Sequence, residues 1–145
     1  MVDFPEVELQ AALIAALDAD QAFSAVCPGG VWDGVPDVAV YPYVRLAELD
    51  VAEARKGRTE ASQVGVSFGV YDRPSDPGAA APTGGAVRVR RVAAALRRAL
   101  ANRPALLPLP SAKVWKVDFV GSTVGAPDKD GAAGKVAFLV YFNER

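Results

Sequence analysis

Few residues in this 145-residue sequence have the types and spacing that catalysis or ligand binding needs. The sequence contains no histidine, which removes the commonest general base, the usual catalytic triads and most zinc sites. Cys27 is the single cysteine, and the sequence shows no partner that would activate its thiol as a nucleophile. We therefore expect Cys27 to be a buried structural residue and the protein to have no catalytic residues.

Two segments resemble ligand-binding loops, but each lacks residues that the ligand requires. Asp128, Lys129 and Asp130 precede a glycine, as at the start of a calcium loop. That loop needs a further ligand before its glycine and a glutamate after it, at the position where Ala137 stands. The glycine-rich run Gly78–Gly85 has no Gly-Lys-Ser/Thr ending that would hold a phosphate. The sequence therefore predicts no metal and no cofactor.

Basic side chains recur in the segment that is expected to form the second long helix, from Ala86 to Ala101. The basic residues of this segment are Arg88, Arg90, Arg91, Arg97 and Arg98. They could form a stripe that contacts nucleic acid, or the solvated face of an amphipathic helix. The solvated face is favoured, because no aromatic side chains interleave for base stacking and the net charge is −1. A small nucleic-acid-binding accessory protein is one alternative function, and a ligand-binding domain with a polar pocket is another.

The spacing of apolar residues predicts the elements that would position these side chains. Leu9, Leu13 and Leu17 recur at helical spacing after a start that Asp3 can cap, and Asp20 can cap a second, short helix. Alternation and turn residues predict strands at Val31–Trp32, Val40–Asp50, Gln63–Asp72, Lys113–Ser122 and Lys135–Asn143.

The order of one helix, three strands, one helix and two strands predicts a single α+β domain over residues 1–145. We expect a two-layer sandwich with a mixed or antiparallel sheet of about four to five strands and two main helices on one face. The second long helix would cross over between two hairpins. Alternation in the third strand places Val64, Val66, Phe68 and Val70 in the core. The small polar residues between them would face solvent or a neighbouring subunit.

The composition is typical of a folded protein outside the membrane. Hydrophobic residues make up 51% of the chain, which is enough for a core at this length. The N-terminal segment has no basic stretch before an apolar one, so we expect neither a signal peptide nor a membrane span. A single cysteine suits a reducing compartment, and we expect the cytoplasm of the producing cell as the setting.

Residues 31–46, VWDGVPDVAVYPYVRL, and the predicted order of elements resemble the tail-completion, or tail-terminator, proteins of long-tailed phages and gene transfer agents. The resemblance covers nearly the whole chain. It implies a small α+β subunit of a ring, typically a hexamer, at the head-proximal end of a completed tail tube. There the ring would stop tube growth and offer a surface to the head connector, without catalysis. Another head–tail connector or joining component is the alternative within this class.

The resemblance also implies partners and a location. The partners would be further copies of the chain, the tail-tube protein and the head connector or stopper protein. Genome DNA would at most pass through the lumen of the ring, and no membrane would be involved. The subunit would lie at the head-proximal end of the tail in the virion, after assembly in the cytoplasm of the bacterial host.

Long charged connections are where contacts with other protein copies are expected. The connections Val51–Ser62, Arg73–Gly85 and Gly125–Gly134 exceed the usual length of about 4–6 residues. Two of them carry the candidate residues of an assembly interface, which are Glu53, Arg55, Lys56, Arg58, Glu60, Asp128, Lys129 and Asp130. Charges of both signs suit contact between copies better than attraction to a polyanion.

Overall fold

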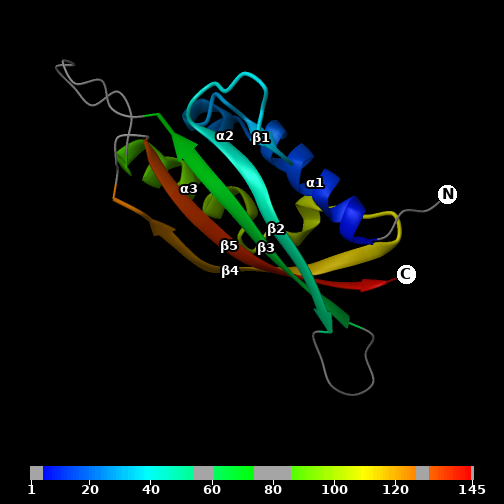
Figure 1. Cartoon of the computed structure of the whole chain (residues 1–145). Coiled ribbons are helices and arrows are strands. Elements are labelled where there is room, and N and C mark those ends of the chain that lie inside the picture. The colour runs from blue at the N-terminus through cyan, green and yellow to red at the C-terminus, as the bar shows by residue number, and fades with distance from the viewer. Residues whose placement is uncertain (1–4, 54–60, 74–85, 127–130, 145) are drawn as a thin grey trace, which may run out of the picture.

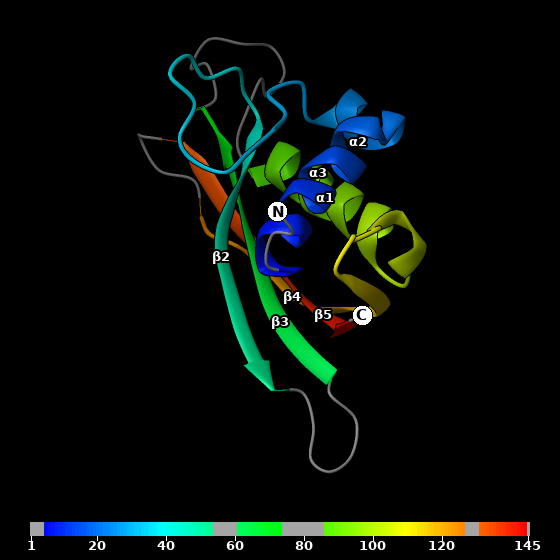
Figure 2. The ribbon, with the colours of Figure 1, turned by 90° about the vertical axis from the view of Figure 1, so that its right-hand side faces the viewer.

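The computed structural model describes residues 5–53, 61–73, 86–126 and 131–144. These residues form two layers, a five-stranded sheet and a layer of helices on one of its faces (Figures 1 and 2). The helices are α1 (Pro5–Ala19), α2 (Gln21–Val26), α3 (Ala86–Leu100) and the short 3-10 helix η1 (Pro104–Leu106). The strands are β1 (Val31–Trp32), β2 (Tyr43–Glu53), β3 (Ala61–Asp72), β4 (Ala112–Val124) and β5 (Ala132–Glu144). The α+β sandwich predicted from the sequence is confirmed.

The strands lie in the order β1-β2-β3-β5-β4 across the sheet. β1 pairs with β2 in parallel, and all other neighbours are antiparallel, so the sheet is mixed. α3 carries the chain from β3 past β5 to β4, which is the predicted crossover (Figure 1). One edge of the sheet is therefore formed by β1 and β2, and the other by β4.

The core lies between the sheet and the helices. Phe68 is fully buried on β3, and Val64, Val66 and Val70 are buried beside it, as alternation predicted. The ring of Phe138 on β5 meets that of Phe68 edge-on, with centroids 6.0 Å apart. The helices add buried apolar side chains to this cluster, among them Leu9, Leu13, Leu17, Val89, Val92 and Leu96. Apolar burial between the two layers thus holds α1 and α3 onto the sheet.

Local polar contacts fix where the helices begin and end. Oδ1 of Asp20 accepts a hydrogen bond from the backbone N–H of Phe23 at 2.9 Å, so Asp20 caps α2 as predicted. After α3, Asn102 adopts a positive φ of 60°, a conformation that asparagine tolerates better than most residues. The N–H of Asn102 donates to the carbonyl oxygen of Val117 at 2.9 Å, which joins the end of the helix to β4. The predicted cap at Asp3 lies outside the described residues.

β2 begins at Tyr43, whereas the sequence predicted a start at Val40. The difference comes from Pro42, which has no N–H to donate to a strand ladder. Its carbonyl oxygen instead accepts a hydrogen bond from the N–H of Gly29 at 3.0 Å. Residues 40–42 therefore pack against the turn after α2 and not along the sheet.

The connections within the two hairpins are shorter than predicted, because the strands stay paired further. β2 and β3 remain in register out to Glu53 and Ser62, inside the connection predicted for Val51–Ser62. β4 and β5 likewise remain paired through Val124 and Gly134. The regular sheet thus includes several residues that were predicted to lie in loops.

Candidate functional site

Cys27 is buried, and its surroundings hold the thiol in the protonated form. Its Sγ lies 3.4 Å from the carbonyl oxygen of Pro42 and 3.7 Å from that of Gly30, to which the thiol can donate. Burial raises the pKa of the Cys27 thiol to about 11, against a smaller lowering by the hydrogen bond to Gly30. Because the thiolate is the reactive form, this thiol is a poor nucleophile at neutral pH. The prediction of a buried structural cysteine is confirmed.

The described ranges also contain no cluster of metal-binding side chains. Within them, no group of three or more His, Cys, Asp or Glu residues could hold an ion. No helix in the same ranges is long and apolar enough to cross a membrane.

The candidate assembly residues fall almost entirely outside the part of the chain that the structure describes. Those outside it are Arg55, Lys56, Arg58, Glu60, Asp128, Lys129 and Asp130. Glu53 is placed through its backbone, which pairs with Ser62 at the end of β2. The role of these eight residues in assembly stays a prediction.

Arg88 at the start of α3 is bound within the molecule. Its Nε lies 3.2 Å from Oδ2 of Asp72, whose side chain is fully buried. Its Nη2 donates a hydrogen bond to the carbonyl oxygen of Tyr41 at 2.8 Å. A buried carboxylate needs such a partner, since an uncompensated charge in the interior is costly. The prediction that this arginine belongs to a solvated face is wrong, because the crossover brings α3 against the end of β3.

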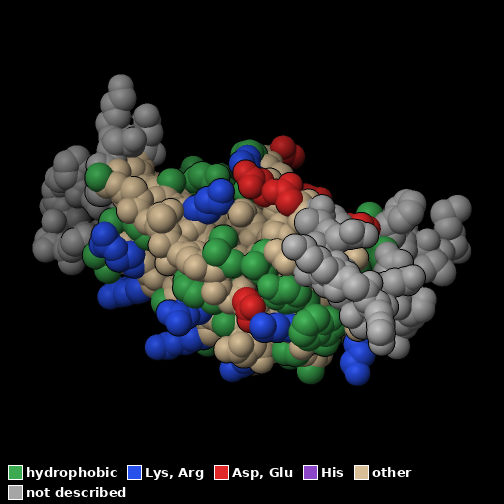
Figure 3. All heavy atoms as spheres, turned by 90° about the horizontal axis from the view of Figure 1, so that it is seen from below, with side chains coloured by type: hydrophobic (Ala, Val, Ile, Leu, Met, Phe, Trp, Pro, Cys, Tyr) green, Lys and Arg blue, Asp and Glu red, His purple; other side chains and the backbone are tan. Residues whose placement is uncertain are grey.

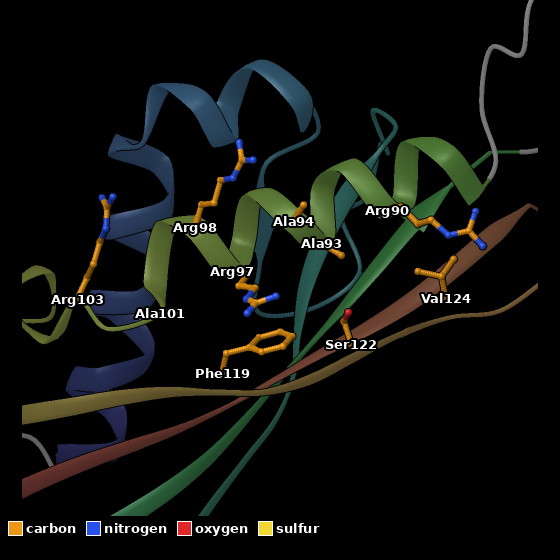
Figure 4. A pocket seen from close by; sticks show the side chains of 10 residues that line it. All are labelled: Arg90, Ala93, Ala94, Arg97, Arg98, Ala101, Arg103, Phe119, Ser122 and Val124. Atoms are coloured by element: carbon orange, nitrogen blue, oxygen red, sulfur yellow. The ribbon is translucent and has the colours of Figure 1, made fainter.

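Four other arginines line an open hollow of about 860 Å³ beside α3 and β4; Arg97 points toward β4, whereas Arg98 and Arg103 point away from it (Figure 4). Arg90, Arg97 and Arg98 come from α3, and Arg103 comes from the connection that follows it. The guanidinium of Arg97 lies 4.4 Å from the ring centroid of Phe119 on β4, a cation–π contact. The remaining lining is small or apolar and consists of Ala93, Ala94, Ala101, Ser122 and Val124. We call this hollow the arginine groove.

The arginine groove is positively charged and has no internal counterion among the residues described. None of its ten lining residues is acidic. The salt bridges formed in the described ranges use Arg88, Lys116 and Lys135, none of which lines the groove. Like charges held close together repel one another, so an anionic partner would lower their energy. The groove is thus suited to bind an anionic group.

The three arginines of α3 that line this groove were among the basic residues predicted from the sequence, whereas the residues that complete the groove were not predicted. Arg103 lies beyond the helix, and Phe119 lies on a strand that meets α3 only through the fold. The observation that no aromatic residues interleave with the arginines is correct along the helix. Across the groove, however, β4 supplies an aromatic ring. Helical periodicity carries no information about such a neighbour.

The segment between β1 and β2 presents apolar side chains to the outside at the opposite edge of the sheet from β4. Three of its side chains are 67%, 83% and 55% exposed, and these are Val35, Val38 and Val40. The segment is nevertheless anchored, because Pro36 is buried and the indole N–H of Trp32 donates to the carbonyl oxygen of Gly29 at 2.8 Å. Asp33 also accepts a hydrogen bond from the side chain of Gln10 on α1 at 3.3 Å. We call residues 33–40 the valine segment.

The sheet face that bears no helices has an aromatic patch at the end of β3. Tyr71 stacks on Tyr43 of β2, with ring centroids 5.3 Å apart. The same ring lies over Gly69, where a Cβ would stand 2.6 Å from the tyrosine hydroxyl oxygen. A Cβ at this position would displace the end of the Tyr71 ring, so glycine lets Tyr71 pack closely against the strand. The predicted small face of β3 is partly covered by the protein's own aromatic side chains.

Comparison with known proteins gives a family and a fold. A family model described as Tail completion protein gp17 matches residues 11–140. Among solved structures, a chain of the "Virion of native gene transfer agent (GTA) particle" is similar to this protein, with a TM-score of 0.75 and 22% sequence identity. The similarity covers 93% of this chain and 94% of that chain, and at this identity it shows a shared fold. The curated proteins give no match. Because the family model extends from α1 into β5, the chain belongs to the tail completion protein gp17 family, a family of structural proteins of phage tails.

Proposed function

We propose that this protein is a subunit of a ring at the head-proximal end of a phage-type tail tube. There it ends the growth of the tube and provides the surface to which the head joins. The observation that carries the proposal is the family match over residues 11–140, which spans nearly the whole fold. A protein that completes a tail must recognise the end of the tube and whatever follows it.

The surface of the subunit supports a role in protein contacts. It combines a charged groove at one edge of the sheet with an exposed apolar segment at the other. Exposed apolar patches and fields of one sign are common marks of interaction surfaces. The proposed partners are further copies of the chain, the tail-tube protein and a head connector or stopper protein. The role is structural and includes no catalysis.

Deletion of the gene in the phage or gene transfer agent that encodes the chain tests this proposal. Without the subunit, electron microscopy should show tails of irregular length and heads that carry no tails. Purified wild-type chain added to such an extract should restore joined particles. Normal tail lengths and complete head–tail joining in the deletion strain would contradict the proposal.

The position of the subunit separates tube termination from another head–tail joining role. A gold-labelled copy should lie at one tip of tails that have been purified without heads. A label found only on isolated heads would instead identify a connector component on the head side.

A nucleic-acid-binding accessory role is the second candidate, and the arginine groove is the observation that favours it. Arginines beside an aromatic ring are a common arrangement for binding single-stranded nucleic acid. Binding to linear DNA across a series of salt concentrations tests this role, because each phosphate contact adds to the salt dependence. Tight, salt-sensitive binding that Arg97→Gln and Arg98→Gln abolish would support the accessory role over the structural one.

A further inference from the structure

We propose that the arginine groove of one copy binds the valine segment of the next copy, so that the subunits join head to tail. This inference rests on the proposed ring and specifies the two surfaces that would hold it together.

The two surfaces lie at opposite edges of the same sheet. The valine segment connects β1 and β2, at one end of the strand order β1-β2-β3-β5-β4. The arginine groove lies beside β4, at the other end. A contact between two different patches is heterologous, and its repetition gives a closed ring or an open filament. This placement therefore leaves each copy with one free surface of each kind for its two neighbours.

The charges of the two surfaces are complementary. Asp33 and Asp37 are exposed on the valine segment, whereas the arginine groove carries four arginines and no acidic lining residue. Figure 3, which shows the molecule from below, has Lys and Arg side chains along one side and a separate group of Asp and Glu side chains; it does not show which of them belong to these two surfaces. Complementary charges steer two surfaces together and fix their relative orientation. They favour contact between an arginine groove and a valine segment over contact between two grooves or between two valine segments.

The apolar parts of the two surfaces also match. Val35, Val38 and Val40 stay exposed although their segment is anchored, so only a partner can remove them from water. Between its guanidinium groups the arginine groove offers alanine side chains of α3 and the side chains of Phe119 and Val124. An apolar centre with charged groups around it is the usual arrangement of a protein interface. A nucleic acid would use the arginines but leave the valines exposed, whereas a second copy accounts for both.

Cysteine pairs in assembled particles test the contact. Val38→Cys and Ala94→Cys in one chain would place thiols on the valine segment and in the groove, while native Cys27 is buried. A bifunctional maleimide should link such particles into a ladder of dimers and larger species that stops at the ring size. Each single variant should stay monomeric on a denaturing gel, because only one of the two surfaces that meet at each contact would then carry a thiol. Val38→Cys with Ala15→Cys is the matched control, since Ala15 is exposed on α1 and does not line the groove.

The outcomes separate this contact from the proposed function. No ladder in tails that contain the doubly substituted chain would overturn the contact and leave the tail role intact. Dimers from Val38→Cys alone would show that the valine segments meet each other, which also overturns it. Absence of the wild-type chain from tails would instead overturn the proposed function, and the contact with it.

Charge exchange provides an independent test of the same contact. Arg97→Glu with Arg98→Glu should abolish head–tail joining, and adding Asp33→Arg with Asp37→Arg in the same chain should restore much of it. Arg91→Glu is the control, because Arg91 is exposed on the same helix but does not line the groove. Circular dichroism would verify that each variant is folded. Loss of joining without any recovery on exchange, together with loss of DNA binding, would assign the groove to nucleic acid.

Discussion

The ion pair of Arg88 and Asp72 joins a helix to the end of a buried strand. Both carboxylate oxygens of Asp72 are used, Oδ2 by Arg88 and Oδ1 by the backbone N–H of Arg73 at 2.9 Å. Arg88→Ala would remove the cation from a fully buried carboxylate. We expect a loss of roughly 3 kcal/mol in the free energy of unfolding, at the low end for buried pairs because Arg88 is partly exposed. Denaturant titration measures this loss, and Arg91→Ala, as an exposed control, should change stability by no more than about 0.5 kcal/mol.

Burial of the Cys27 thiol predicts a pH dependence of stability. The folded-state pKa is raised to about 11, whereas an unfolded thiol ionises near pH 9.0. As the pH rises, the unfolded state loses its proton first, so the stability that the protonated thiol contributes is complete below about pH 9 and declines toward pH 11. The stability difference between wild type and Cys27→Ala should therefore shrink over this interval. A difference that does not change with pH would contradict the assignment.

Phe68 is a test of the core. Phe68→Ala should lower the free energy of unfolding by about 3–5 kcal/mol, because the ring is fully buried against Phe138. Thermal and denaturant unfolding measure the effect. Trp115→Ala is a useful comparison, since that side chain is 46% exposed and should matter less. Equal stability of wild type and the Phe68 variant would contradict the core assignment.

The sequence could predict Phe68 but not the role of Arg88, for a physical reason. The alternation that buries Phe68 is a local property of a strand, so neighbouring residues carry it. The partner of Arg88 lies on another element, and its identity depends on how the crossover sets α3 on the sheet. The same holds for Phe119 beneath Arg97. Contacts between elements determine the partners of Arg88 and Arg97, and the periodicity of residues within one element carries no information about such contacts.

At the scale of elements, the β2–β3 hairpin allows a prediction about the connection that contains Arg55 and Arg58. The two strands stay paired as far as Glu53 and Ser62, so the ladder does not depend on the residues between them. Because loop-closure entropy grows slowly with length, replacing Arg55–Arg58 by a short Gly-Ser turn should be nearly neutral for the melting temperature. If these charges act in assembly, the folded variant should fail to complement a deletion in particle assembly. Full complementation would show that the connection is passive.

The edge strand β4 indicates how subunits can and cannot meet. Its pairing with β5 is interrupted by register shifts between Val114 and Lys116 and between Phe119 and Gly121. Irregularities of this kind discourage edge-to-edge strand pairing. Contact through side chains in the adjacent groove is therefore easier than extension of the sheet into a neighbour. The sequence placed β4 correctly but could not show these shifts, because they arise from pairing with β5.

At the scale of the whole molecule, the absence of histidine predicts that the purified protein carries no stoichiometric metal. One cysteine, and no metal-binding cluster in the described ranges, leave few soft or nitrogen ligands for a transition metal. Elemental analysis after dialysis should give far less than one ion per chain. One tightly held ion per chain would mean that acidic residues outside the described ranges form a site.

Arg88 also links the surroundings of the two proposed contact surfaces within one subunit. Its guanidinium joins the carbonyl of Tyr41, which directly follows the valine segment, to Asp72 of the sheet, and it stands on the helix that walls the arginine groove. The surroundings of the two surfaces that would meet neighbouring copies are thereby linked through one side chain. In a closed ring, the angle between these two surfaces decides how sharply successive copies turn. Curvature, and with it the width of the channel at the centre, would then be fixed by the shape of a single subunit.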